Sequence, residues 1–284
     1  MNNYLEQQRF CLSDAWQQRF AGIYRLYGRS TVQVLAQAHM VVVGLGGVGS
    51  WAAEALARSG IGALTLIDLD EICISNTNRQ LHAVQSQLGQ SKVNTLCARL
   101  KDINPELQLT PIEDFLGLEN IAQLITPEHH GVLDAMDMAH TKAALVAYCL
   151  ARKILIVTTG SAGGKADPSQ VTYTDLGRTQ YDPLLAKMRR DLICEHGFRQ
   201  NRRRKYRLDA IFSTERMVYP QSDGSVSETK YGLSTGAGLD CAGSFGSSTM
   251  VTGSFGFMAA SRLVARHLLR WQRGQVRVRG EPTA

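Results

Sequence analysis

The sequence lacks several patterns that mark common classes of protein. Its six cysteines are scattered, and no two of them form a C-x-x-C pair, which argues against a zinc ribbon. The first eleven residues are polar and contain no apolar stretch of the kind found in secretion signals. Scattered cysteines without such a signal indicate reduced thiols, so we expect a cytoplasmic protein.

Long apolar runs are scarce as well. Residues 241–261 carry no charge, but they are rich in glycine, serine and threonine and fall short of a membrane span. We interpret residues 249–269 as a largely buried helix that ends in the basic residues Arg262, Arg266 and Arg270. Membrane association is therefore not expected.

Most of the chain has no excess of one charge. Lys and Arg number 31 against 25 Asp and Glu, and residues 178–216 alone hold eleven of the former and five of the latter. The whole excess of six positive charges thus lies in one segment. An anionic partner such as RNA would explain it, but a solvated surface loop would give the same composition, and residues 202–205 taken alone favour that loop.

What the chain does contain is a regular alternation of strand and helix patterns. Apolar runs predict strands at 39–45, 63–70, 107–113, 131–137 and 154–160, with helical spacing at 47–60, 91–104, 120–125 and 142–153. This order is typical of an α/β fold, a Rossmann-like doubly wound, mostly parallel sheet. After residue 160 the pattern changes, and we expect a C-terminal α+β extension with a basic insertion at 178–216.

A glycine motif lies between the first predicted strand and its helix. Gly44, Gly46 and Gly49 match G-x-G-x-x-G, which lets a backbone approach a phosphate at the amino end of a helix. Asp68 ends the next strand, where a carboxylate can accept hydrogen bonds from ribose. These features predict a nucleotide site and allow either NAD or ATP, so an NAD-dependent oxidoreductase stays open at this point.

Polar residues further along favour a triphosphate. Arg79 has a planar guanidinium group that can donate two parallel hydrogen bonds, and Lys92 has a compact positive charge. The pyrophosphate of a dinucleotide is usually held by the glycine loop and does not require these two cations. Asp134 and Asp137 end the strand at 131–137, and a carboxylate there can hold Mg²⁺ against phosphate oxygens. The candidate nucleotide-binding residues are Gly44, Gly46, Gly47, Gly49, Asp68, Asp70, Asn76, Asn78, Arg79, Lys92 and Asp134.

The succession G-x-G-G-x-G-S, D-x-D, S-N-x-N-R-Q, K and D-x-x-D resembles the ATP-binding module of the ubiquitin-activating-enzyme superfamily, which includes the sulfur-carrier adenylyltransferases. The resemblance implies that Gly47 lies against the phosphates and Asp68 holds the ribose. It implies a homodimer in which an N-terminal arginine enters the neighbouring site, with Arg25 as first candidate and Arg19 as second. The remaining implied roles are phosphate contacts for Asn76, Arg79 and Lys92, and Mg²⁺ binding for Asp137.

Stretches along nearly the whole chain resemble the tRNA threonylcarbamoyladenosine dehydratase subgroup. They include residues 13–28, 46–70, 76–83, 157–170, 212–226 and 240–251. This resemblance implies ATP-dependent cyclisation of a threonylcarbamoyl group beside the tRNA anticodon, with ATP and Mg²⁺ as cofactors, tRNA as substrate and a sulfur-relay protein as a candidate partner. An adenylating domain at 1–160 and an extension at 161–284, packed on it, would carry this reaction. The implied catalytic residues are Arg79, Lys92, Asp137 and Arg25.

Two further functions remain alternatives. An adenylyltransferase acting on the C-terminus of a small sulfur-carrier or ubiquitin-like protein would share the nucleotide motifs, although the missing C-x-x-C pairs and the basic segment argue against it. A non-catalytic nucleotide-sensing module would also share them. We interpret Cys241 as a small buried residue rather than a nucleophile, because intramolecular cyclisation needs no thioester.

Overall fold

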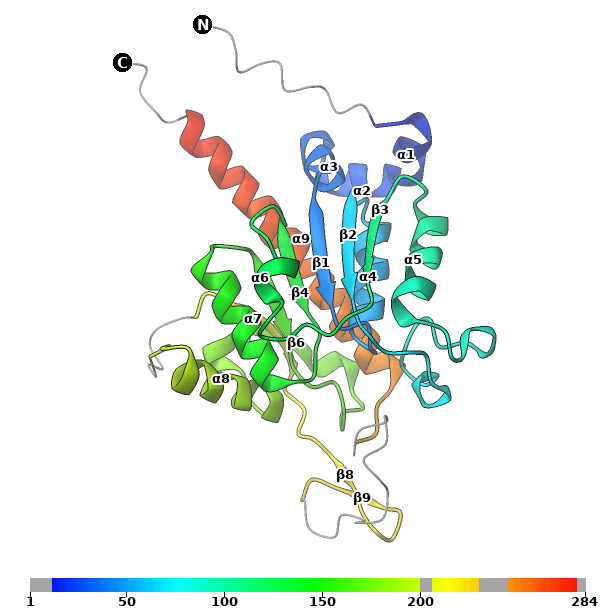
Figure 1. The fold of residues 1–284 in the computed structure, drawn as a ribbon, viewed down its shortest axis with the longest axis vertical. Coiled ribbons are helices and arrows are strands. Elements are labelled where there is room, and N and C mark those ends of the chain that lie inside the picture. The colour runs from blue at the N-terminus through cyan, green and yellow to red at the C-terminus, as the bar shows by residue number, and fades with distance from the viewer. Residues whose placement is uncertain (1–11, 200–205, 230–244, 280–284) are drawn as a thin grey trace, which may run out of the picture.

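A seven-stranded sheet forms the centre of the computed structural model, which describes residues 12–199, 206–229 and 245–279. Its strand order is β3-β2-β1-β4-β5-β7-β6, and every neighbouring pair is parallel except β6 with β7 (Figure 1). This arrangement confirms the predicted α/β fold class. The strands are β1 (His39–Val43), β2 (Ala63–Ile67), β3 (Gln108–Ile112), β4 (Gly131–Asp134), β5 (Ile156–Thr159), β6 (Val171–Asp175) and β7 (Asp209–Ser213).

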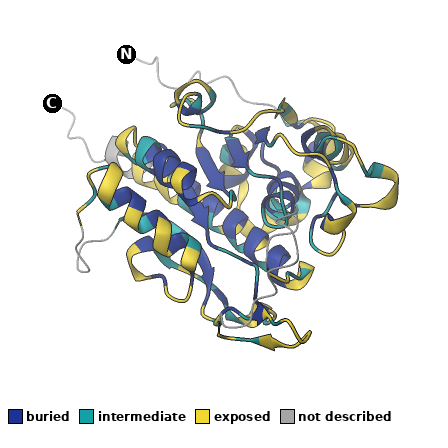
Figure 2. Ribbon diagram, turned by 60° about the horizontal axis from the view of Figure 1, so that its bottom comes forward, coloured by how far each residue is buried: buried dark blue, intermediate teal, exposed yellow. Residues whose placement is uncertain are grey.

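Helices cover both faces of this sheet. Successive side chains of a strand point to opposite faces, so Met40 and Val42 of β1 join one apolar cluster and Val41 and Val43 join the other. One cluster includes α4 (Gly49–Arg58), α5 (Lys92–Ile103) and α9 (Thr249–Arg279), and the second includes α6 (Ile121–Leu124), α7 (Ala139–Ala151) and α8 (Pro183–Glu195). Figure 2 shows the buried strands between helices whose outer surfaces are exposed.

Shorter elements complete the described part of the chain. Three N-terminal helices, α1 (Asp14–Arg19), α2 (Ala21–Tyr27) and α3 (Arg29–Ala36), lie at the amino ends of β1 and β2 (Figure 1). A small ribbon pairs β8 (Tyr219–Pro220) with β9 (Val226–Ser227). Single 3₁₀ turns are η1 (Ile74–Asn76), η2 (Gln85–Gln87), η3 (Pro168–Gln170) and η4 (Leu176–Arg178).

The basic segment at 178–216 is more regular than the sequence suggested. It contains α8, which begins at Pro183 after Asp182 caps it by accepting from the Leu185 amide. It also contains β7, which lies between β5 and β6 in the sheet and is mostly buried. Neither element was predicted, because charged residues surround both apolar patterns.

Helix α9 is longer than expected and packs closely on α4. It extends to Arg279, ten residues beyond the predicted end at Leu269. A side chain at Gly256 would lie 2.6 Å from the Val48 carbonyl oxygen, so glycine permits this contact directly behind the glycine loop. Among the described residues, no helix is long and apolar enough to cross a bilayer.

Candidate nucleotide-binding site

A cavity of about 850 Å³ opens at the carboxyl ends of the parallel strands, where ligands of such sheets bind. Its walls come from the loops after β1, β2, β4 and β5, and from the start of α5. Most of the predicted residues gather here, although they are far apart in the chain. Those that line the cavity are Gly44, Gly46, Gly47, Asp68, Asp70, Asn76, Arg79, Lys92 and Asp137.

The glycines of the motif have different roles. Gly44 has φ +84°, and a side chain there would lie 2.9 Å from the Ala135 carbonyl oxygen. A side chain at Gly49 would lie 1.8 Å from the Gly44 carbonyl oxygen, so the fold itself requires both glycines. Gly46 has no such neighbour within 3.9 Å and faces the cavity, which leaves its backbone free for a phosphate.

The same loop leads into the amino end of α4. No side chain caps this helix, and although the Ser50 amide donates to the Gly46 carbonyl at 3.2 Å, the other amide groups of the first turn keep their capacity to donate hydrogen bonds. The positive end of the helix dipole adds to this capacity. Together the loop and the helix end form a binding surface for an anion.

Asp68 holds the glycine loop in shape. Its carboxylate accepts from the Leu45 amide at 2.6 Å and from the Asp70 amide at 2.9 Å. Burial raises the pKa of this carboxyl group, and the nearby Lys92 ammonium opposes that shift. The remaining lone pairs face the cavity, where ribose hydroxyl groups could donate to them.

The two cations of the site are positioned by different contacts. Lys92 is buried at the start of α5, and its ammonium lies 2.7 Å from a carboxylate oxygen of Asp70. Arg79 donates to the Ser75 carbonyl at 2.7 Å and to the Asn78 side chain at 3.0 Å. Both cations line the cavity, where they could offset the charge of a triphosphate.

The two aspartates after β4 are placed differently. Asp137 is exposed in the cavity and has no ion-pair or hydrogen-bond partner among the described residues. Asp134 is fully buried, 2.9 Å from the Lys142 ammonium and 2.6 Å from the Thr158 hydroxyl group. The expectation that Asp134 contacts the nucleotide is therefore corrected, since its carboxylate supports the loop from below.

Other predicted residues lie outside the cavity lining. Gly49 is buried at the start of α4, and Asn78 donates to the Ser247 carbonyl at 2.8 Å. Arg25 lies on α2, among the N-terminal helices at the end of the sheet opposite the glycine loop (Figure 1). Arg19 donates to the Ile103 carbonyl at 3.1 Å. Cys241 and residues 202–205 lie outside the described residues.

One wall of the cavity has no counterpart among the predicted residues. It comes from residues 161–163, after β5, and from Met217, Tyr219 and Phe245. The Asp182 carboxylate at the start of α8 fixes this wall by accepting from the Ser161 amide at 2.9 Å. The rings of Tyr219 and Phe245 meet edge to face, with centroids 5.4 Å apart. The residues of this wall lie within the stretches 157–170, 212–226 and 240–251 that resemble the dehydratase subgroup, but none was predicted as a site residue, because only tertiary packing brings them to the cavity.

Comparison with known proteins identifies the family. The model of the ThiF family matches residues 19–270, most of the chain. The chain belongs to the ThiF family. This ThiF-family chain is 49% identical over 259 residues to the tRNA threonylcarbamoyladenosine dehydratase of Escherichia coli strain K12, covering 91% of this chain and 97% of that protein.

Solved structures agree with this similarity. Crystal structures of the E. coli tRNA N6-threonylcarbamoyladenosine dehydratase in complex with ATP and with AMP superpose on this ThiF-family chain with TM-scores of 0.83 each. Their sequence identities are 45% and 47%, and each match covers 93% of this chain and 99% of the other. The likeness therefore extends over both the predicted adenylating half and the C-terminal extension.

Proposed function

We propose that this protein is an ATP-dependent tRNA threonylcarbamoyladenosine dehydratase. The observation that carries the proposal is the combination of near full-length similarity to the E. coli dehydratase with a cavity that gathers the predicted ATP-binding residues. In this reaction the threonyl carboxylate attacks the α-phosphate of ATP, and pyrophosphate leaves. A heteroatom of the carbamoyl unit in the same group then attacks the activated carboxyl carbon, which closes the ring, releases a proton and expels AMP. The net change in the nucleoside is the loss of one water.

The geometry supports a role for each group around the nucleotide. The Gly46 and Gly47 backbone and the amino end of α4 would bind phosphates, and Asp68 would accept hydrogen bonds from the ribose. Arg79 and Lys92 would stabilise the negative charge that develops on the departing pyrophosphate. Asn76 accepts from the Cys73 amide at 3.0 Å, and its amide group would donate to a phosphate.

The site also fits a magnesium ion. Mg²⁺ binds through one or two carboxylates together with waters and substrate phosphates, and Asp137 offers an unpartnered carboxylate in the cavity. The bound ion would neutralise phosphate charge. The buried Lys142 ammonium donates to the Met136 carbonyl at 3.0 Å and thereby orients the loop that carries Asp137.

The quaternary arrangement and setting are part of the same proposal. We propose a cytoplasmic homodimer in which Arg25 of the partner subunit reaches the nucleotide. Arg25 does not line the cavity of its own chain, so a role at the phosphates requires a neighbouring copy. A sulfur-relay protein remains the proposed additional partner, carried by the family resemblance.

A direct assay tests the reaction. Purified protein is mixed with Mg-ATP and tRNA that bears the linear threonylcarbamoyl group, and the nucleosides are then examined by mass spectrometry after mild digestion. We expect a nucleoside lighter by one water and an equal amount of AMP. Asp137→Asn should lower kcat by about a hundredfold or more, since metal-assisted charge stabilisation contributes several kcal/mol, and its melting temperature should stay unchanged because Asp137 is exposed.

The opposite results would also be informative. Full activity of Asp137→Asn would remove the proposed metal ligand. AMP transfer to the C-terminus of a small sulfur-carrier protein, with the tRNA unchanged, would instead establish the adenylyltransferase that the sequence left open.

A further inference from the structure

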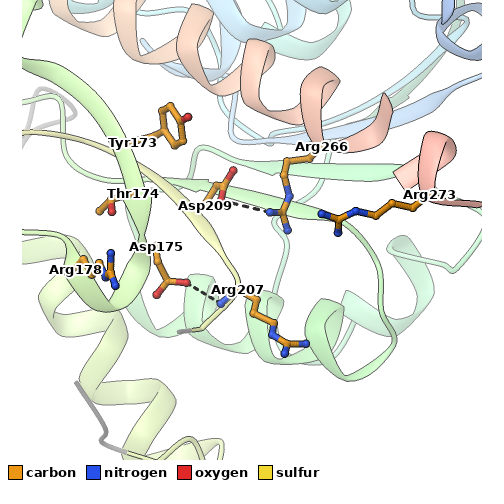
Figure 3. Close-up of a pocket in the computed structure, with 8 residues that line it drawn as sticks. All are labelled: Tyr173, Thr174, Asp175, Arg178, Arg207, Asp209, Arg266 and Arg273. Carbon is orange, nitrogen blue, oxygen red and sulfur yellow. Dashed lines mark hydrogen bonds and ion pairs between the residues drawn. The ribbon is translucent and has the colours of Figure 1, made fainter. Parts of the chain in front are cut away.

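A second cavity, which we call the arginine groove, lies between the edge strand β6 and the C-terminal half of α9. Its volume is about 670 Å³, and none of its lining residues, which Figure 3 shows, lines the nucleotide cavity. The residues that matter for its chemistry are Tyr173, Arg178, Arg207, Asp209, Arg266 and Arg273. Four of the eight residues that line it are arginines, namely Arg178, Arg207, Arg266 and Arg273.

The acidic residues of the groove are already engaged. Asp175 accepts hydrogen bonds from the backbone amides of Gly177, Tyr206 and Arg207. Asp209 is bound by Arg262 through two nitrogens, at 3.1 and 2.7 Å. Their carboxylates therefore hold the groove together.

Three of the arginines remain available to a ligand. The guanidinium groups of Arg178, Arg207 and Arg273 are exposed and have no hydrogen-bond or ion-pair partner among the described residues. Within the part of the chain that the structure describes, the one polar contact of the Arg266 side chain is a long ion pair of 3.8 Å with Asp209. Figure 3 shows Arg266 and Arg273 side by side on α9, with Arg207 projecting from the segment before β7.

Rigid elements present these charges. Arg262, Arg266 and Arg273 are four and seven residues apart along α9, a spacing that places them on one helix face. The Arg262 guanidinium also lies over the Tyr173 ring, 3.8 Å from its centroid, and ties the helix to the edge strand. A positively charged surface of this kind is preorganised for phosphates, which arginine binds with a planar, two-pronged donor.

The position of the groove indicates how large its ligand is. Three strand spacings separate β1 from β7, and Asp209 lies two residue levels below Ile211, which pairs with Thr159 at the rim of the nucleotide cavity. Standard sheet dimensions then place Asp209 about 16 Å from the glycine loop. The groove therefore lies beyond the nucleotide cavity, at a distance that the backbone phosphates of a nucleic acid can reach when its target base lies in the cavity.

We propose that the arginine groove binds backbone phosphates in the anticodon stem of the tRNA whose modified adenosine occupies the nucleotide cavity. The inference rests on the proposed function, because that function supplies a polyanion extending beyond the cavity. In this proposal, residues of α9, β6 and the start of β7 contribute to the affinity for the tRNA substrate. An acidic protein is the competing ligand, but the proposed reaction requires none.

The test combines two exposed arginines in one variant, Arg207→Ala with Arg273→Ala. Binding of a labelled anticodon stem-loop is followed by fluorescence anisotropy at several salt concentrations. We expect about tenfold weaker binding and a salt dependence shallower by about 0.7–0.9 for each phosphate that the variant no longer neutralises. The affinity for ATP and the kcat at saturating tRNA should stay at wild-type values, and the KM for tRNA should rise.

Lys101→Gln provides a control at the opposite edge of the sheet. Lys101 lies on α5, which packs against β2 and β3, and its exposed side chain donates to the Leu107 carbonyl at 3.0 Å. This variant loses one positive charge where the test variant loses two, so wild-type binding by it would show that the loss of a surface cation elsewhere does not by itself weaken RNA binding. The isolated loop strand is a second control, since the double variant should bind it as the wild type does.

Two kinds of failure can be told apart. Wild-type stem-loop affinity and salt dependence in the double variant would overturn the groove proposal, whether or not the enzyme dehydrates tRNA. A fall in poly-glutamate binding together with unchanged RNA binding would assign the groove to an acidic protein. Absence of dehydration by the wild-type protein would instead overturn the proposed function.

Discussion

Two glycines of one motif give opposite predictions at the scale of single residues. Gly46→Ala should leave the melting temperature within about 2 °C of wild type, since a surface change without a clash typically costs under about 0.5 kcal/mol. The added methyl group should nevertheless weaken ATP binding about tenfold or more, because it stands where a phosphate approaches the backbone. Calorimetric titration with ATP and a thermal melt measure the two effects separately.

Gly49→Ala is the matched comparison. Its methyl group would overlap the Gly44 carbonyl oxygen at 1.8 Å, so we expect a loss of several kcal/mol in unfolding free energy. If both variants melted like the wild type and bound ATP equally well, the assignment of fold and ligand roles to these glycines would be wrong.

The same residues show what sequence can and cannot reveal. The glycine motif, Asp68 and Lys92 were predicted because local spacing marks them, and the structure brings them to one cavity. Asp134 was predicted to bind the nucleotide because it ends a strand. A carboxylate in that position can face either the cavity or the core, and here it faces the core because it pairs with Lys142. Residue spacing does not reveal such a partner. The wall formed by Met217, Tyr219 and Phe245 depends on tertiary packing alone.

At the scale of elements, the connection between β4 and α7 is controlled by the buried pair of Lys142 and Asp134. Lys142→Met would leave the Asp134 carboxylate without its cation in the core, which typically costs about 3–5 kcal/mol. Urea unfolding measures this loss. Because the Lys142 ammonium also donates to the Met136 carbonyl, the turnover of any folded protein should decrease as well.

A double variant separates the two effects. Asp134→Asn combined with Lys142→Met removes both charges and keeps an acceptor for the Thr158 hydroxyl group, so much of the stability should return. The turnover should stay low, because the bond to Met136 is still missing. Recovery of both stability and turnover would show that the pair does not position the loop that carries Asp137.

Elements also differ in how readily the sequence predicts them. Strand β1 and helix α4 were predicted because their apolar patterns are continuous and a glycine turn lies between them. Strand β7 was not predicted because its five residues lie in a charged segment. Its pairing with β5 and β6 also depends on residues that are distant in the chain. The extension of α9 was not predicted because residues 270–279 are rich in arginine and glutamine and show no continuous apolar pattern.

At the scale of the whole molecule, buried histidines couple the fold to pH. His82 and His267 are almost fully buried, and desolvation lowers the pKa of each to about 4. The unfolded chain takes up protons first, near the ordinary pKa of 6.5, while the folded chain keeps both rings neutral. Their contribution to stability is therefore complete above pH 6.5 and decreases as the pH falls towards 4.

This linkage predicts a measurable slope. Between pH 6.5 and 5, the unfolding free energy should fall by up to about 1.4 kcal/mol per pH unit for each of the two histidines. Burial also lowers the pKa of His39, His129 and His130, which adds to the slope in the same direction, whereas burial raises the pKa of Asp68 and Asp182, which opposes it. Urea titrations at several pH values measure the slope, and His267→Gln should make it shallower by the share of one residue. A free energy that stays constant from pH 6.5 to 5 would contradict the lowered pKa values, because these rings would then take up protons in the folded chain as readily as in the unfolded chain.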